Sequence, residues 1–495
     1  MKPTRCIECE EIQLARVSDA RPVQMLPLPR EALDGDALRA GLTRRSLLAG
    51  GIAGFAAVYG SRVFGLQEVF ESAVASAAPP ADTALVLLYL AGGNDGLNTI
   101  VPGPGLNGGA DYANYAAHRA AIHRTQVPGP TGSTPIAGTA SQMSWSNLVT
   151  GAGNGAGVGF DTMYGAGDGG ASSQLAFMPA VDYQPYSLSH FDSSDYWFAG
   201  ELAKPTSGWL GRWIDDNGSD TNPLQAVSID NALSKAIRTH GKPVCSITNL
   251  LSLGFSMNDV GGISLPKGTR SPVDINGTMV ALGNVATRRG NTYLNATRST
   301  YKLAVTVAGE SGALGGVPES GAPYPKGQLA PKLRLAAKLL GAGLGTRIIT
   351  VHWGVFDTHG GQVAMQDPQL QELSAALAAF QADLAARGVE NKVATLVFSE
   401  FGRRVAENAS GGTDHGAGGL MLATGSAVRG GWASPFPGTR AADLDPTGNL
   451  KIPTDFRSVY QAVLTEWLGG NTAGVLPGGP FPPLSRADGS QALFR

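Results

Sequence analysis

Short apolar runs recur along this chain, and each is bounded by polar or glycine-rich residues. The clearest run is 84–90 (ALVLLYL), which ends abruptly in the segment AGGNDG at 91–96. Similar runs occupy 224–229, 347–352 and 392–398. A run that is apolar at consecutive positions, without alternation, is typical of a strand whose two faces are both covered. We therefore expect these runs to form the buried strands of a mostly parallel sheet.

Helical periodicity fills the spaces between the later runs. Apolar side chains within 329–340 recur on one helical face, and 370–387 is an Ala/Leu-rich stretch followed by a glycine. Both stretches predict helices. A closing helix is expected at 454–468, with Thr454 as its N-cap.

Alternation of helices and apolar strands predicts the α/β class, with a mostly parallel central sheet and helices on both faces. A chain of 495 residues fits one large domain with insertions, or two domains. We expect one α/β domain over 82–495. Loop-rich insertions are predicted at about 103–173, which is rich in Gly, Ser, Thr and Asn, and at about 264–320, which has no clear periodicity.

The N-terminal part of the chain carries an export pattern. Thr43-Arg44-Arg45-Ser46-Leu47-Leu48 precedes a Gly/Ala-rich apolar run that extends from 47 to about 59, and small residues at 73–77 offer a cleavage site. The order of these features predicts an arm and twin-arginine signal peptide over 1–77. The alternative is a buried Gly/Ala helix after a chance arginine pair.

This export pattern predicts an extracytoplasmic protein that meets the Tat translocase during export. The apolar run is too short and too rich in glycine to be a stable membrane anchor. More than forty residues precede the arginine pair, so either translation starts later, for example at Met25, or this arm acts before export.

Cysteine and charge exclude several classes of function. Cys6 and Cys9 form one CxxC motif without a second pair nearby, so they do not make a structural zinc site. Cleavage leaves Cys245 alone, and no intramolecular disulfide or CxxC redox chemistry remains. A net charge of −2 gives no field that would attract nucleic acid.

Polar residues suited to chemistry follow three of the expected strands. Asp95 follows the first strand, Asp357 and His359 follow the strand at 347–352, and Glu400 follows the strand at 392–398. In a parallel sheet these strand ends share one edge, where an open α/β sheet places its ligands. We expect the residues to converge there.

These residues predict a metal site. Asp357 and His359 are two positions apart, so in an extended segment they point the same way, and a glycine-rich loop adds Asp414 and His415. The mixture of imidazole and carboxylate favours a divalent metal, zinc or manganese, with magnesium or calcium as the alternative if carboxylates dominate. Taken singly, each Asp also fits a turn or helix cap, and His352 fits a core position.

Several longer segments carry a family resemblance. The segments are LVLLYLAGGNDGLNTIVP, SLSHFDSSDYWFAG, GWLGRWID, VHWGVFDTHGGQ, FSEFGRRVAENASGGTDHGAGG and TDFRSVYQAVLTEWLG. Together they resemble the bacterial family called domain of unknown function 1501 (DUF1501), which itself resembles the alkaline phosphatase and sulfatase superfamily. The resemblance covers 85–470 and implies an alkaline-phosphatase-like fold.

The superfamily resemblance implies a role for each matching position. It implies metal ligands at the positions Asp95, Asp357, His359, Glu400 and His415. The nucleophile would be Ser189 at the start of a helix, with Ser193 and Ser194 as alternatives.

Two departures from the superfamily pattern are visible in the sequence. Phe401 stands where alkaline phosphatases have a histidine after the acidic residue, so His352 or His190 would have to complete that metal position. No cysteine lies near Ser189, which removes the formylglycine route of type I sulfatases.

Two functional hypotheses follow. The first is an exported metal-dependent hydrolase of phosphate or sulfate esters, acting on a small-molecule or polymer ester, with metal activating a serine or water nucleophile. Arg403 is then expected to hold substrate oxygens, with Arg404 and Arg212 as alternatives. The second is a secreted binding or assembly protein that retains the hydrolase fold without turnover.

Overall fold

A computed structural model describes residues 58–59, 83–248 except 128, 130, 166–172 and 205, together with 314 and 316–495. The predicted arm and signal peptide, apart from Val58 and Tyr59, lie outside the described residues, as does most of the predicted insertion at 264–320. Within the described part of the chain, no helix combines the length and apolar character needed to cross a bilayer.

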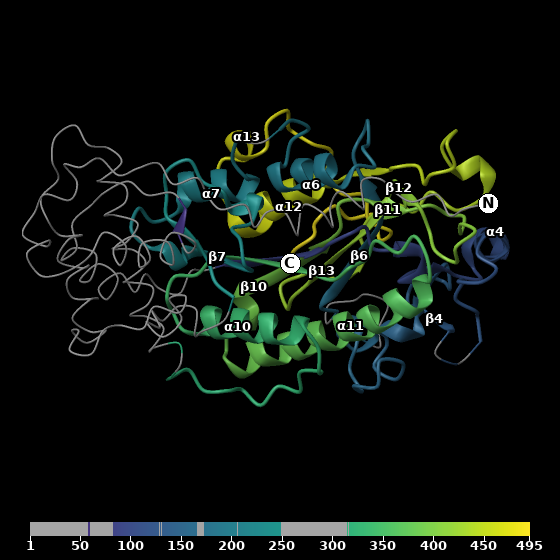
Figure 1. The fold of residues 1–495 in the computed structure, drawn as a ribbon, viewed down its shortest axis with the longest axis horizontal. Coiled ribbons are helices and arrows are strands. Elements are labelled where there is room, and N and C mark those ends of the chain that lie inside the picture. The colour runs from purple at the N-terminus through teal and green to yellow at the C-terminus, as the bar shows by residue number, and fades with distance from the viewer. Residues whose placement is uncertain are drawn as a thin grey trace, which may run out of the picture.

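A ten-stranded mixed sheet forms the centre of the molecule (Figure 1). Along the sheet the order is β1-β8-β7-β9-β2-β10-β13-β6-β14, and β15 also pairs with β6. Five strands run parallel to one another: β8 (Val244–Ser246), β7 (Ala226–Ile229), β9 (Ile348–Trp353), β2 (Ala84–Leu90) and β10 (Val393–Phe398). The predicted α/β class with a mostly parallel sheet is confirmed.

The other strands of the sheet are shorter or run against this group. β13 (Gly419–Thr424) is antiparallel to β10 and to β6 (Leu175–Asp182), while β14 (Gly431–Trp432) and β15 (Thr454–Asp455) run parallel to β6. β1 (Val58–Tyr59) pairs antiparallel with β8 at the opposite edge.

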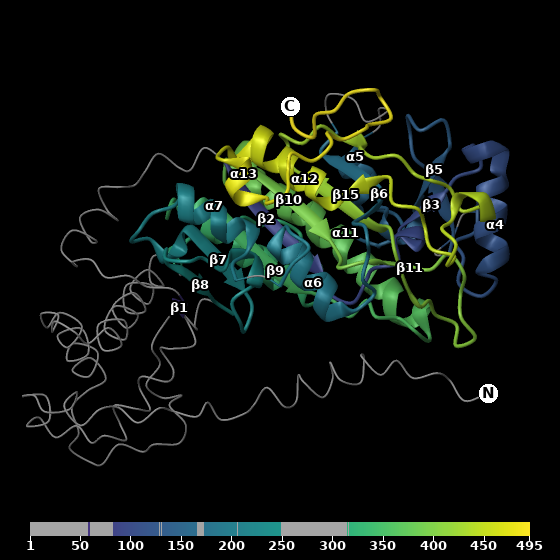
Figure 2. The ribbon, with the colours of Figure 1, turned by 90° about the horizontal axis from the view of Figure 1, so that it is seen from above.

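Helices cover both faces of the sheet (Figures 1 and 2). One layer consists of α10 (Leu329–Gly341) and α11 (Gln362–Ala386); the other contains α6 (His190–Ala199), α7 (Trp209–Asn217), α12 (Phe456–Ala462) and α13 (Thr472–Val475). Helices α10 and α11 also pack against each other.

The alternation of side chains along β2 explains why its whole run is apolar. Val86 and Leu88 belong to the core beneath α10 and α11, where they join Leu333. Leu85 and Leu87 point to the other face and join the core that contains Trp197 and Trp209. Burial of apolar surface contributes a stabilising free energy of about 25 cal/mol per Å². Because helices cover both faces of β2, an apolar side chain is favoured at every position of the strand.

Two helix boundaries differ from the sequence prediction. α11 begins at Gln362, eight residues before the expected start, and its first turns carry buried glutamines that the apolar pattern does not reveal. The closing helix begins at Phe456, because Thr454 pairs in β15 and Asp455 is the N-cap, accepting from the Arg457 N–H.

The segment predicted as a loop-rich insertion at about 103–173 contains regular structure. It contributes to a three-stranded sheet of β3 (Ile100–Pro102), β5 (Met143–Ser146) and β4 (Ser133–Pro135), and it holds α4 (Ala110–His118) and α5 (Phe160–Tyr164). Trp145 packs edge-on against Phe177 of β6, which ties this small sheet to the central one.

Asp182 at the end of β6 provides a pH-dependent test of the fold. Its carboxyl is fully buried and accepts the backbone N–H groups of Gly418 (2.9 Å) and Tyr183 (3.1 Å). Burial outweighs these bonds and raises the pKa of Asp182 to about 8. A carboxyl with a raised folded pKa binds more protons in the folded state, so its stabilising contribution is present at low pH and is lost as the pH rises to 8.

We predict that Asp182→Asn flattens this dependence. Between pH 5 and pH 8, the free energy of unfolding of the variant minus that of the wild type should rise by at least about 1 kcal/mol. Urea unfolding at a series of pH values measures the difference, and Asp220→Asn, on the surface, is the control. A difference that stays constant with pH would show that Asp182 is ionised throughout this range.

Candidate metal centre

Three neighbouring strands bring distant segments to one edge of the sheet. β9, β2 and β10 are adjacent and parallel, so the loops that follow them leave the sheet together. Gly92 in the loop after β2 has φ +108°, and a Cβ atom there would lie 2.5 Å from the backbone nitrogen of Asp357. Glycine at this position therefore allows the two loops to touch.

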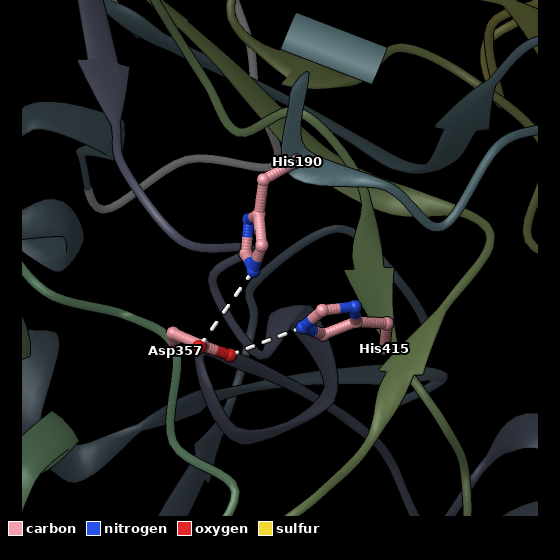
Figure 3. A group of neighbouring side chains, drawn as sticks. All are labelled: His190, Asp357 and His415. Atoms are coloured by element: carbon pink, nitrogen blue, oxygen red, sulfur yellow. Dashed lines mark hydrogen bonds and ion pairs between the residues drawn. The ribbon is translucent and has the colours of Figure 1, made fainter. Parts of the chain in front are cut away.

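The centre of the site is a cluster of His190, Asp357 and His415 (Figure 3). His190 is the first residue of α6, Asp357 lies in the loop after β9, and His415 begins β12 (His415–Gly416). One ligand atom from each of the three residues lies within 4.8 Å of the others. The Nε2 atom of His415 is 3.1 Å from Asp357 Oδ1, and the Nε2 atom of His190 is 3.7 Å from Asp357 Oδ2.

A third histidine stands beside this cluster. His359 Nε2 lies 3.1 Å from Asp357 Oδ1 and 3.0 Å from His415 Nε2. His359 is more exposed than His190 and His415, which are buried. Asp357 therefore lies next to three imidazole rings.

The outer nitrogen of each ring contacts an oxygen atom. His190 Nδ1 lies 2.6 Å from Glu400 Oε1, His415 Nδ1 lies 2.8 Å from the Leu188 carbonyl, and His359 Nδ1 lies 3.0 Å from Asp414 Oδ1. A carbonyl or carboxylate oxygen accepts, so we assign the ring proton to Nδ1 in each case. In the absence of metal the Nε2 atoms can share protons with Asp357; once those protons are released, this assignment leaves the lone pair of each Nε2 available to a cation, the arrangement that orients histidines around a metal.

The residues present fit a divalent cation. The contacts among His359 Nε2, His415 Nε2 and Asp357 Oδ1 need a proton or a cation between the two atoms of each pair, and a bound metal would supply the positive charge. Imidazole nitrogens and one carboxylate form a donor set that suits zinc or another first-row metal.

The electrostatics of the cluster also favour a positive charge at this place. Burial alone would lower the pKa of His190, but the carboxylates of Asp357 and Glu400 outweigh it and raise that pKa to about 9. Burial likewise opposes ionisation of Asp357, yet hydrogen bonds from the histidines and the charge of Arg403 hold its pKa well below the usual range. The pKa of His415 is lowered, chiefly by burial. Asp357 is therefore ionised and His415 neutral at pH 7, the forms in which both residues bind metals, whereas His190 carries a proton that it must release before it can bind one.

The structure brings together three of the five metal ligands expected from the sequence: Asp357, His359 and His415. Glu400 lies behind His190 instead, where its oxygens also accept the backbone N–H groups of Gly92 (3.0 Å) and Gly93 (3.1 Å). These contacts allow it to orient the His190 ring.

Asp95 is not part of the cluster. Its carboxylate caps the turn at Gly96–Asn98 and forms a buried ion pair with Arg119, with an Oδ2–Nη1 distance of 2.5 Å. Gln362 donates to the same oxygen. Asp95 does follow the end of β2, as the sequence predicts, but the charge of its carboxylate is paired with Arg119.

The sequence indicates His190 only as a substitute ligand. The structure places it in the cluster, because the N-terminus of α6 approaches the loop after β10. Phe401 fills the space between the rings, with its centroid 4.8 Å from that of His190 and 4.5 Å from that of His415. The residue expected to weaken the metal site therefore forms its apolar wall.

His352, the other substitute considered, contacts different partners. Its Nδ1 lies 3.4 Å from Asp230 Oδ2, and its ring stacks on Phe198 with a centroid distance of 5.3 Å. These contacts place the His352 ring beside Asp230 and Phe198, away from the partners of Asp357.

The three serines considered as nucleophiles have different surroundings. Ser189 is the N-cap of α6, and its Oγ accepts from Asp192 N at 3.5 Å, a weak contact. Ser193 is fully buried, where its hydroxyl donates to the Glu400 carbonyl and accepts from Tyr183. Ser194 donates to the Phe191 carbonyl at 3.3 Å. Of the three serines, Ser189 is the one directly bonded to two residues of the site: it precedes His190, and it follows Leu188, whose carbonyl contacts His415.

Arg403 was expected to hold substrate oxygens, but its guanidinium is buried and bonded to the protein. It donates to the carbonyls of Gly92, Gly93 (2.8 Å), Phe356 (3.0 Å) and Thr413 (2.8 Å), and its Nη2 lies 2.7 Å from Asp357 Oδ1. It fixes the loops around Asp357.

The alternative arginines are also bonded within the protein. Arg404 donates to the Thr447 carbonyl at 3.0 Å. Arg212 donates to the carbonyls of Ala199 and Val475 in the layer of α6 and α7.

The fold and this cluster define an α/β protein with an imidazole and carboxylate site beyond the carboxyl edge of a mixed, mostly parallel sheet. Residues 320–446 match the family model described as protein of unknown function (DUF1501). The matched stretch contains Asp357, His359, Glu400 and His415, whereas His190 lies before it. No curated protein showed significant sequence similarity to the chain.

Proposed function

We propose that this protein is a metal-dependent hydrolase of phosphate or sulfate esters that acts outside the cytoplasm. The proposal is carried by one observation: three imidazole Nε2 atoms surround Asp357, and each ring is oriented by an acceptor at its Nδ1. Such preorganised donor sets recur in metal sites.

His190, Asp357 and His415 would hold the metal, with His359 as a further donor. When bound, a divalent cation supplies charge to neutralise ester oxygens and lowers the pKa of a water or serine nucleophile. Arg403 keeps Asp357 ionised and in place. Phe401 excludes water from one side of the rings.

Ser189 is our choice for the nucleophile. Attack of its Oγ on phosphorus or sulfur would release the alcohol, and water would then hydrolyse the covalent serine ester; direct attack by water gives the same products. The start of α6 favours this place, since the free N–H groups of a helix N-terminus stabilise negative charge. The neighbouring side chain of Phe191 is 46% exposed, so aryl esters are suitable first probes.

We predict that Ser189→Ala lowers the turnover of aryl phosphates or aryl sulfates by at least about 100-fold, in the range seen when an activated nucleophile is removed. Metal content should stay at the wild-type level, because the Ser189 hydroxyl is not one of the proposed metal ligands. Ser194→Ala is the matched control, since this hydroxyl lies on the same helix and contacts only a backbone carbonyl. Equal turnover in both variants would assign the attack to water.

A binding or assembly protein without turnover is the second candidate. The donors of Arg403 favour it, because they are bonded to protein oxygens and leave the substrate without the cation that the sequence predicted. Metal that binds stoichiometrically while neither aryl phosphates nor aryl sulfates are turned over would support this candidate.

A further inference from the structure

Gln362 connects the two loops that carry the cluster residues. Its side chain is fully buried at the first position of α11. Its Oε1 accepts from the hydroxyl of Thr358 (3.1 Å) and from the hydroxyl of Thr413 (2.6 Å). Thr358 stands between Asp357 and His359, and Thr413 is two residues before His415. One amide oxygen therefore bonds to both ligand-bearing loops.

The backbones of the two loops meet at the same place. Thr413 N donates to the Thr358 carbonyl at 3.1 Å, and Gln362 N donates to the Gly411 carbonyl at 3.0 Å. A Cβ atom on Gly412 would lie 2.3 Å from the Thr358 carbonyl oxygen. The loops are in direct backbone contact, and the side chain of Gln362 lies at their junction.

The orientation of this amide is fixed from the other side. Gln362 Nε2 donates to Asp95 Oδ2 (2.5 Å) and to Gln366 Oε1 (3.2 Å), and Asp95 is held by Arg119. With two donated and two accepted bonds, every hydrogen-bonding position of the side chain is used. The buried carboxylate of Asp95, which sequence analysis expected to bind metal, instead determines which way the amide faces.

We propose that Gln362 is a positioning residue for the metal centre. It sets the separation between Asp357 and His415 through Thr358 and Thr413, and it does not touch the cation or the substrate. The inference rests on the metal site of the proposed function and is independent of ester hydrolysis. A buried amide with all of its bonds satisfied holds its partners in one arrangement, because each alternative leaves a polar group without a partner.

Two substitutions and one control separate positioning from general stability. Gln362→Met keeps the length of the side chain and removes its four hydrogen bonds. Gln362→Glu keeps an acceptor for both threonines and places a second oxygen against Asp95. Gln366→Met is the matched control: this amide is buried one turn further along α11, where it donates to Asn94 and to the Asp95 carbonyl and accepts one bond from Gln362, but it bonds to neither threonine. This substitution therefore removes one of the Gln362 bonds and leaves both loop contacts in place.

The experiment uses Co²⁺ as the probe metal and the full mature chain. Co²⁺ affinity and the visible absorption spectrum of the loaded protein are measured by titration, and thermal unfolding of the metal-free proteins is recorded beside them. We expect Gln362→Met and Gln362→Glu to bind Co²⁺ about 10 to 100 times more weakly than wild type, the usual effect of losing a group that orients a metal ligand. The intensity of their visible bands should also change, whereas Gln366→Met should keep the wild-type spectrum and an affinity within about threefold of wild type.

The outcomes distinguish this role from the proposed function. Wild-type affinity and spectrum in both Gln362 variants would overturn the positioning role, and so would equal losses in Gln362→Met and Gln366→Met. If Gln362→Met does not fold, Thr413→Val removes one of the two accepted bonds and must show the same change in spectrum. A wild-type chain that binds Co²⁺ but hydrolyses no ester would contradict the proposed function alone, and one that binds no Co²⁺ would overturn both.

Discussion

Replacing Asp357 with asparagine should abolish stoichiometric metal binding and, with it, ester hydrolysis. The carboxylate lies next to the Nε2 atoms of three histidines and is the only acidic group whose oxygens do so among the described residues. Asparagine preserves its shape but removes the charge that the rings and a cation share. We expect metal affinity to fall by more than about 100-fold, beyond the range for groups that merely support a ligand, and turnover to fall at least as far.

Asp414→Asn is the matched control for this substitution. Asp414 contacts His359 from the outer side, at Nδ1, and it is more exposed than Asp357. Its loss should weaken metal binding by about 10-fold at most. If Asp357→Asn binds metal as tightly as Asp414→Asn, the cluster is not the metal centre.

The second large effect is expected on stability. Asp95→Ala leaves the guanidinium of Arg119 buried without its carboxylate partner, and both side chains are at most 1% exposed. Breaking a buried ion pair by removing one partner costs about 3–5 kcal/mol. We predict a loss of this size in the free energy of unfolding of the metal-free protein, measured by urea denaturation.

A second substitution tests the cause of that loss. In the double variant Asp95→Ala with Arg119→Met, no unpaired charge is buried, so a substantial part of the stability should return. A ligand role for Asp95 makes the opposite prediction: the metal-free protein would be little affected by Asp95→Ala, and the cost would appear only when metal is present. That result would restore the role expected from the sequence.

The strands that position the site were predictable because they are buried on both faces. β2 and β10 match apolar runs in the sequence almost residue for residue. β13 and β6 were not predicted, since β13 lies in a glycine-rich stretch and β6 ends in a buried Asp182. Their burial depends on partners far away in the sequence, which a local pattern does not record.

The same distinction applies to the site. Strand ends predicted that Asp357 and His359 would lie at one edge of the sheet, because parallel strands place the loops that follow them together, and a glycine-rich loop added His415. They did not predict that Arg119 would pair with Asp95 or that Glu400 would orient His190, since both contacts join elements that only the fold brings together. The position of a carboxylate directly after a strand therefore predicts that the residue lies at the edge of the sheet, but it does not by itself predict that the residue binds a metal.

The most direct test of the proposed metal centre is elemental analysis of the purified protein, with hydrolysis of aryl phosphate and aryl sulfate followed in the same samples. The account predicts a stoichiometric divalent metal, zinc or manganese first, whose removal by a chelator abolishes turnover and whose return restores it. A protein that takes up no divalent metal at physiological concentrations would contradict the account, and the cluster around Asp357 would then be a structural network of hydrogen bonds.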